Sequence, residues 1–297
     1  MATGDLISAA DYNNIRNKII GIIGPGSGQS GYGQIIQSSA VTADSIISKA
    51  QWDRLRYDIY NALIHQTGSV PSINEVTQNS VIRYGASHPV FQYDTLADQA
   101  ITNKFNIGGG RFAIEAGTVA SRTTAWTAAV STTVTVTFST ADQARYFFNS
   151  GGKLTLASSR TGGSSTAQND SWSNLLSAAG IRTFDAISST INFYNLTNVD
   201  QLLYSTTASI PYAANSYQIR VRGDVANNSA GGARIITFTV SWSDPYVDSD
   251  PSNPPPDQID GTLSLTVEQY RATGPVLPSG NFTITGPSYT NSGITGS

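Results

Sequence analysis

The chain has 297 residues, of which 39% are hydrophobic and only 12% are charged, and its formal net charge is −3. It contains no cysteine and no run of lysine and arginine, which excludes disulfides, thiolate chemistry, cysteine-ligated metals and the electrostatic footprint of a nucleic-acid-binding protein. Because the usual charged share is about a quarter, we expect much of the surface to be covered by neighbouring subunits.

A short segment occurs twice near the N-terminus, since the sequence of Ile7–Ile19 returns in similar form as Ile47–Ile59. In the first copy Ser8 is a good helix N-cap and Asp11 completes a capping-box pattern, so the spacing predicts a helix over 9–23. The apolar positions of this helix share one face: Tyr12, Ile15, Ile19, Ile22 and Ile23.

The second copy repeats this design, with Ser48 as the cap, Gln51 closing the box and Gly68 ending the helix. Its apolar stripe consists of Trp52, Leu55, Ile59, Ala62 and Leu63. The Gly- and Ser-rich stretch 24–33 is interpreted as a flexible linker. The two helices could form a hairpin, or their stripes could pack against symmetry mates. A two-helix unit buries too little to be stable alone, so in either case we expect its apolar faces to need a further partner. The predicted assembly interface consists of Tyr12, Ile15, Ile19, Trp52, Leu55 and Ile59.

The sequence predicts three regions: a two-helix attachment or oligomerisation segment over 1–70, a connecting region over 71–125 and a β-sandwich domain over 126–297. Within the connecting region the residue pattern predicts extended pieces over 80–84 and 88–93, a helix over 96–105 and a break at 108–110.

From Trp126 onward the hydrophobic period changes to two, which is typical of strands. Strands are predicted over 130–138, 152–158, 190–194, 217–223, 234–242, 262–267 and 282–285. The strongest hairpin candidate joins 219–223 to 234–238. Helical insertions are predicted over 141–148 and 171–179, the second capped by Asp170 or Ser171. The predicted fold class is α+β, mainly β: an N-terminal helical segment followed by an antiparallel, jelly-roll-like β-sandwich with short helical insertions.

A Pro- and Asp-rich loop over 244–257 interrupts two strands and is predicted to project from the domain. Tyr246, Asp248 and Asp250 are its candidate exposed contact residues. Ca²⁺ prefers clustered carboxylates, but the loop lacks the glycine and the terminal glutamate of an EF-hand. We therefore predict a solvated acidic loop and no metal site, with Ca²⁺ binding as the alternative.

The sequence contains no recognisable catalytic constellation. Gly26–Gly31 matches G-x-G-x-x-G formally, but a helix precedes it where a dinucleotide site needs a strand, so no cofactor is expected. His65 and His88 are the only histidines and neither lies near a nucleophile motif, while the three glutamates are scattered. We therefore expect a protein that is not an enzyme. Trp126, Trp172 and Trp242 are candidate sugar-stacking residues, and of these Trp172 and Trp242 are interpreted as core residues because they lie on an apolar helix face and on an alternating strand.

Two blocks of sequence are distinctive as strings: residues 4–19 with 31–34, and residues 142–163 with 169–176. They resemble virion structural proteins of tailed bacteriophages, especially phages of marine and freshwater cyanobacteria, in which such blocks recur in tail-fibre-like proteins. The resemblance implies a multi-copy particle component, assembled in the host cytoplasm and located in the virion, and it carries over no catalytic residue.

The expected function is that of a non-enzymatic structural component of a tailed-phage virion, associated with the tail fibre or baseplate and working by homo-oligomeric assembly. Expected partners are other copies of the chain and other virion proteins, with a host-surface glycan as a further candidate. No nucleic-acid or membrane partner is expected, because the chain lacks a basic patch, a signal peptide and an apolar span of about 20 residues.

A trimer is favoured by analogy with fibres, with a hexamer as the alternative. Alternative functions are a neck, collar or capsid-decorating protein, a carbohydrate-binding host-recognition module and a depolymerase.

Overall fold

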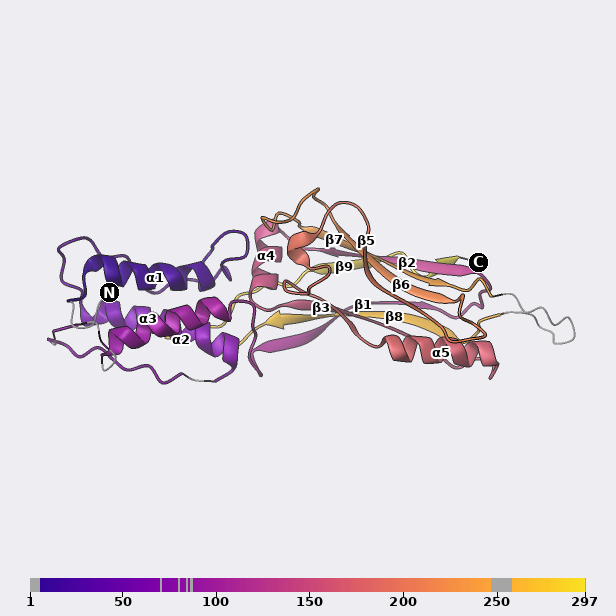
Figure 1. Ribbon diagram of the computed structural model, residues 1–297, viewed down its shortest axis with the longest axis horizontal. Coiled ribbons are helices and arrows are strands. Elements are labelled where there is room, and N and C mark those ends of the chain that lie inside the picture. The colour runs from indigo at the N-terminus through magenta and orange to yellow at the C-terminus, as the bar shows by residue number, and fades with distance from the viewer. Residues whose placement is uncertain are drawn as a thin grey trace, which may run out of the picture. The chain divides into compact units, whose positions relative to one another are not determined.

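The computed structural model describes residues 6–69, 71–79, 81–83, 85, 88–246 and 258–296 (Figure 1). About 27% of the chain is helix and 29% is strand, and the strands form two antiparallel sheets, which confirms the predicted α+β class. The chain divides into two compact units. The first comprises residues 1–113, 145–152 and 271–285, and the second comprises residues 114–144, 153–270 and 286–297. Each unit is therefore built from segments that are distant in the sequence.

Three helices pack together in the first unit (Figure 1): α1 (Ala9–Ile23), α2 (Lys49–Thr67) and α3 (Pro89–Thr102). Both predicted capping boxes are confirmed. The Oγ of Ser8 accepts a hydrogen bond from the backbone of Asp11, whose carboxylate accepts one from the backbone of Ser8. Ser48 and Gln51 make the same pair of bonds at the start of α2. The two helices are therefore initiated locally, as the sequence predicts.

The apolar stripes of α1 and α2 form the centre of this helical core. The ring of Tyr12 meets that of Trp52 edge to face, with centroids 5.0 Å apart, and Trp52 meets Tyr93 of α3 with centroids 5.8 Å apart. All six residues of the predicted assembly interface are fully buried within the chain: Tyr12, Ile15, Ile19, Trp52, Leu55 and Ile59. The expectation that these stripes await a partner is therefore corrected, because α3 of the same unit packs on both helices.

Helix α3 begins earlier than the sequence predicts. His88 is its N-cap, and Pro89 occupies the first turn, where the missing N–H removes no helical hydrogen bond. The extended piece expected over 88–93 is therefore wrong. The helix expected over 96–105 ends at Thr102.

The strands have the following bounds: β1 (Phe112–Arg122), β2 (Ala129–Thr137), β3 (Lys153–Thr161), β4 (Arg182–Phe184), β5 (Gln201–Thr207), β6 (Ser216–Gly223), β7 (Ile235–Ser243), β8 (Thr262–Ala272), β9 (Ser288–Asn291) and β10 (Thr295–Gly296). The four-stranded sheet has the order β1-β8-β3-β4, and the other has the order β10-β2-β7-β6-β5, with β9 also paired to β2. The predicted β6–β7 hairpin is confirmed, with Ile219 opposite Val240. Phe184 of β4 meets Phe238 of β7 with centroids 5.5 Å apart, so side chains of the two sheets meet in a shared core.

Two predicted strands are wrong. Over 190–194, the side chain of Asn192 accepts a hydrogen bond from the backbone of Tyr194 and caps the short 3₁₀ helix Phe193–Asn195. Such local bonds compete with strand pairing. Residues 282–285 form a loop, in which the N–H of Phe282 donates to the carbonyl of Gly274.

The two helical insertions, α4 (Ala141–Asn149) and α5 (Ala167–Ala179), are present. The expected N-cap of α5, Asp170 or Ser171, is wrong. The N-cap is Thr166, whose side chain accepts a hydrogen bond from the backbone N–H of Asn169. None of the helices in the described ranges combines the length and apolar character needed to cross a membrane.

Candidate functional site

The residues expected to form an exposed contact loop are only partly described. Tyr246 is half-buried and meets Tyr212 edge to face, with ring centroids 4.7 Å apart, which leaves only part of its ring for contact with a partner. Asp248 and Asp250 lie outside the described residues. Asp244 is buried and accepts a hydrogen bond of 2.7 Å from Gln168. No group of three or more metal-ligating side chains occurs in the described part of the chain.

Asp260, which follows this loop, joins the turn after β3 to helix α5. Its carboxylate accepts hydrogen bonds from the backbone and hydroxyl of Ser164 and from Asn169, and it pairs with Arg160 at 3.3 Å. The bond from the Ser164 backbone is the main cause that lowers the pKa of Asp260. A Cβ at Gly163 would lie 2.6 Å from this carboxylate, so the close approach requires glycine. The cluster fastens the turn after β3 to α5.

His65 is likewise a structural residue. Its ring is fully buried and stacks on Phe282, with centroids 4.4 Å apart. Because a carbonyl can only accept, Nε2–H donates to the oxygen of Ser150 at 2.7 Å. Burial lowers the pKa of His65 from 6.5 to about 4, so the ring is neutral near pH 7. Its Nδ1 is buried without a hydrogen-bond partner among the described residues, which makes the imidazole part of the core rather than a solvent-facing base.

The loop after α1, interpreted as a flexible linker, is held by the C-terminal half of α4. The guanidinium of Arg145 donates to the carbonyls of Ser30 and Pro25 at 2.6 and 2.9 Å. Asn149 donates to the carbonyl of Gly31 at 3.1 Å. These donors come from a segment far along the sequence. Local composition therefore predicts a flexible loop, whereas in the fold hydrogen bonds from α4 fix its position.

The segment after this loop is fixed along α2 by a buried carboxylate. Asp58 is fully buried and accepts hydrogen bonds of 2.9 Å from the backbone N–H groups of Gln37 and Ser38. Burial raises the pKa of the Asp58 carboxyl, while these hydrogen bonds oppose the rise. The pair of bonds determines where residues 34–38 lie on the helix.

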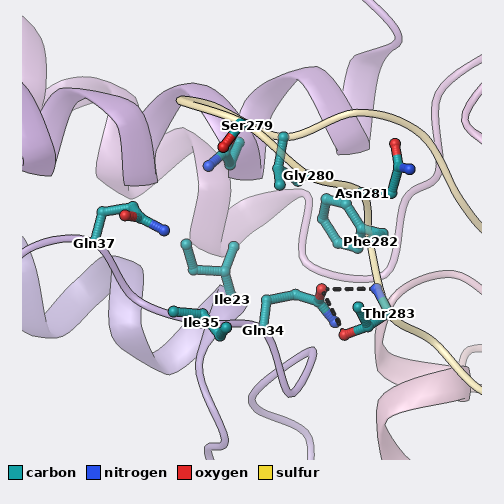
Figure 2. Close-up of a pocket in the computed structure, with 11 residues that line it drawn as sticks. Ile23, Gln34, Ile35, Gln37, Ser279, Gly280, Asn281, Phe282 and Thr283 are labelled. Atoms are coloured by element: carbon teal, nitrogen blue, oxygen red, sulfur yellow. Dashed lines mark hydrogen bonds between the residues drawn. The ribbon is translucent and has the colours of Figure 1, made fainter.

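One turn further along α2, Asn61 fixes a second segment. Its carboxamide donates to the carbonyl of Leu277 at 2.9 Å and accepts from the N–H of the same residue at 2.8 Å. Gln34 then joins the two segments, since its Oε1 accepts from the N–H of Thr283 at 3.0 Å (Figure 2). Three parts of the chain that are distant in sequence are thereby held around one depression.

We call this depression the neutral hollow. Its volume is about 240 Å³, below the roughly 300 Å³ at which small-molecule sites usually begin. No lining residue has an ionisable side chain. Figure 2 shows the lining residues: Ile23, Gln34, Ile35, Gln37, Asn61, Val276, Ser279, Gly280, Asn281, Phe282 and Thr283. Ile35 is 84% exposed. The hollow suits an apolar side chain of another polypeptide segment, with the backbone amide groups of that segment on either side. It suits neither a metal ion nor a charged substrate.

No protein-family model, curated protein or solved structure matches this chain. The sequence does hold one signal for the hollow. On α2 the polar residues Asp58, Asn61 and His65 follow helical spacing, and all three are buried. This polar stripe marks a second buried face of α2, whose polar groups need hydrogen-bond partners from other segments. The sequence does not say which segments supply them.

Proposed function

We propose that this chain is a non-enzymatic structural component of a tailed-bacteriophage virion, associated with the tail fibre or baseplate, that works by assembling with copies of itself and with other virion proteins. The low charge of the chain supports this role, because a surface with few charges is suited to burial against neighbours. The ionisable groups that an enzyme could use, such as Asp58, His65 and Asp260, are engaged in holding segments of the chain.

A second support comes from the two blocks of sequence that resemble phage virion proteins. Parts of these blocks pack together in the first unit: a Cβ at Gly33 would collide with the ring of Tyr146, and Asn149 binds the carbonyl of Gly31. The resemblance therefore covers residues of both blocks that contact each other. Gln34, at the end of the first block, lines the neutral hollow.

The observation that carries the proposal is the exposure of Ile35 at the neutral hollow. Its side chain is 84% exposed and lies among uncharged lining residues. Burying such a side chain contributes about 1.5–3 kcal/mol, which corresponds to at least a tenfold change in affinity. A subunit contact that covers Ile35 and fills the hollow is the arrangement that uses both features.

Replacing Ile35 with Asp tests the contact, because a charge cannot be buried there without a partner. We expect sedimentation velocity at micromolar concentration to show self-association of the wild-type chain that is at least tenfold weaker in Ile35→Asp. The matched control is Val199→Asp, since Val199 is 67% exposed and does not line the hollow. Equal association of both variants and wild type would refute a contact through Ile35.

The location on the particle requires a separate experiment. Immunogold electron microscopy of intact particles, with an antibody raised against the purified chain, should place label on the tail fibres or baseplate. Label on the neck or capsid would instead support a collar or decorating protein. Absence of the chain from density-purified particles would refute a virion role.

A further inference from the structure

A second hollow lies in the second unit, between edge strands of the two sheets. Strand β4 ends the four-stranded sheet, and β5 ends the other. The space between them has a volume of about 370 Å³, within the range of small-molecule sites. We call it the Arg182 hollow. Its lining consists of Ile181, Arg182, Thr183, Ser188, Ser189, Thr190, Ile191, Leu203 and Tyr204.

Arg182 brings a positive charge to this hollow. Its guanidinium lies over the ring of Tyr204, 3.7 Å from the centroid, and donates one hydrogen bond to the carbonyl of Ala179. No carboxylate among the described residues pairs with it, and its Nε is buried without a hydrogen-bond partner. Stacking and the bond to Ala179 hold the guanidinium in one orientation. Because Nε is buried, the groups that a ligand in the hollow would meet are the remaining N–H groups of the two terminal nitrogens.

The loop on the other side of this hollow is held in place before any ligand arrives. The carboxylate of Asp185 accepts hydrogen bonds from the backbone of Ile187 and from the backbone of Ser188, at 2.9 and 2.7 Å. Asn195 donates to the carbonyl of Thr190 at 3.0 Å. The hydroxyls of Ser189 and Thr190 are exposed. They are therefore presented by a loop that has little ordering entropy to lose on binding.

We infer that the Arg182 hollow binds a saccharide that carries one carboxylate, such as a uronic acid residue. One fixed guanidinium matches one monoanion, and a bidentate bond from arginine to a carboxylate is among the strong hydrogen bonds in proteins. The hydroxyls of Ser189 and Thr190 match the hydroxyls of a sugar ring. The side chains of Ile181, Ile191 and Leu203 offer an apolar surface for its C–H face.

This inference goes beyond assembly and does not depend on it, because the hollow and the neutral hollow lie in different units. A phosphate dianion is a weaker match, since only one cationic side chain lines the Arg182 hollow.

The test uses the full chain and three probes: trisaccharides of glucuronate, galacturonate and mannuronate, each compared with its uncharged methyl ester by isothermal titration calorimetry. We expect at least one acid to bind, with its methyl ester at least tenfold weaker. Arg182→Gln should weaken binding at least tenfold, whereas Arg234→Gln should leave it unchanged, since Arg234 is exposed and lies outside the hollow.

A second variant, Ser189→Trp, keeps Arg182 and fills the hollow from an exposed position, so it should abolish binding even if Arg182→Gln unfolds. Three outcomes would overturn the inference: no acid binds at millimolar concentration, the esters bind as well as the acids, or inorganic phosphate displaces the bound saccharide at equal concentration.

Discussion

Acidification should destabilise the first unit, and His65 makes a contribution that can be calculated. The folded chain holds its ring neutral because burial lowers its pKa from 6.5 to about 4. Between these two pH values the unfolded chain carries a proton on His65 and the folded chain does not. The free energy of unfolding therefore rises with pH across this window. The stabilising effect is complete above pH 6.5 and is lost progressively as the pH falls towards 4.

The magnitude follows from the difference between the two pKa values. At about 1.4 kcal/mol for each tenfold difference in proton affinity, the His65 contribution amounts to about 3 kcal/mol. Two other groups act in the same range of pH. Burial also lowers the pKa of His88, which adds to the slope, while the raised pKa of Asp58 opposes it.

Comparison with His65→Phe isolates the effect, because the contributions of His88 and Asp58 remain in both proteins. Phenylalanine keeps a ring against Phe282 but loses the bond to Ser150, so we expect it to be less stable by about 1–3 kcal/mol at pH 7. The assay is pulsed hydrogen–deuterium exchange in urea at pH 4 to 7.5, read from peptides of α2. The wild-type curve should be steeper than that of His65→Phe. Parallel curves would refute the assignment of the pH dependence to this ring.

Three further predictions concern residues of α2 and are checked by urea denaturation and hydrogen exchange. Asp58→Ala should lower the free energy of unfolding by about 2–4 kcal/mol, because it leaves two backbone N–H groups without their acceptor. The control, Asp53→Ala, removes only a partly exposed ion pair and should lower it by less than about 1 kcal/mol. Asn61→Ala should cost about 1–3 kcal/mol and speed exchange at the N–H of Leu277, and unchanged exchange there would contradict the clamp. Leu55→Ala should cost about 2–5 kcal/mol, and a neutral effect would show that the stripe is not core.

Patterns that depend on neighbours in the sequence predict this fold well. The two capping boxes require only residues three apart, and both form as the spacing predicts. Strand β7 alternates along its whole length, and its buried residues are those that the period of two selects. Local reasoning fails where two local signals compete: Pro89 suggests an extended piece but stands in the first turn of α3, and Asn192 caps a turn within an apparent strand.

The amino-acid sequence by itself determined where α1 and α2 begin and which of their residues avoid water. Only the tertiary structure decided what covers those residues, because α3 packs on both helices from a position far along the chain. The same reason explains the neutral hollow. It is lined by segments distant in sequence, so its position depends on hydrogen bonds such as that of Gln34 to Thr283, which no periodicity along the chain encodes.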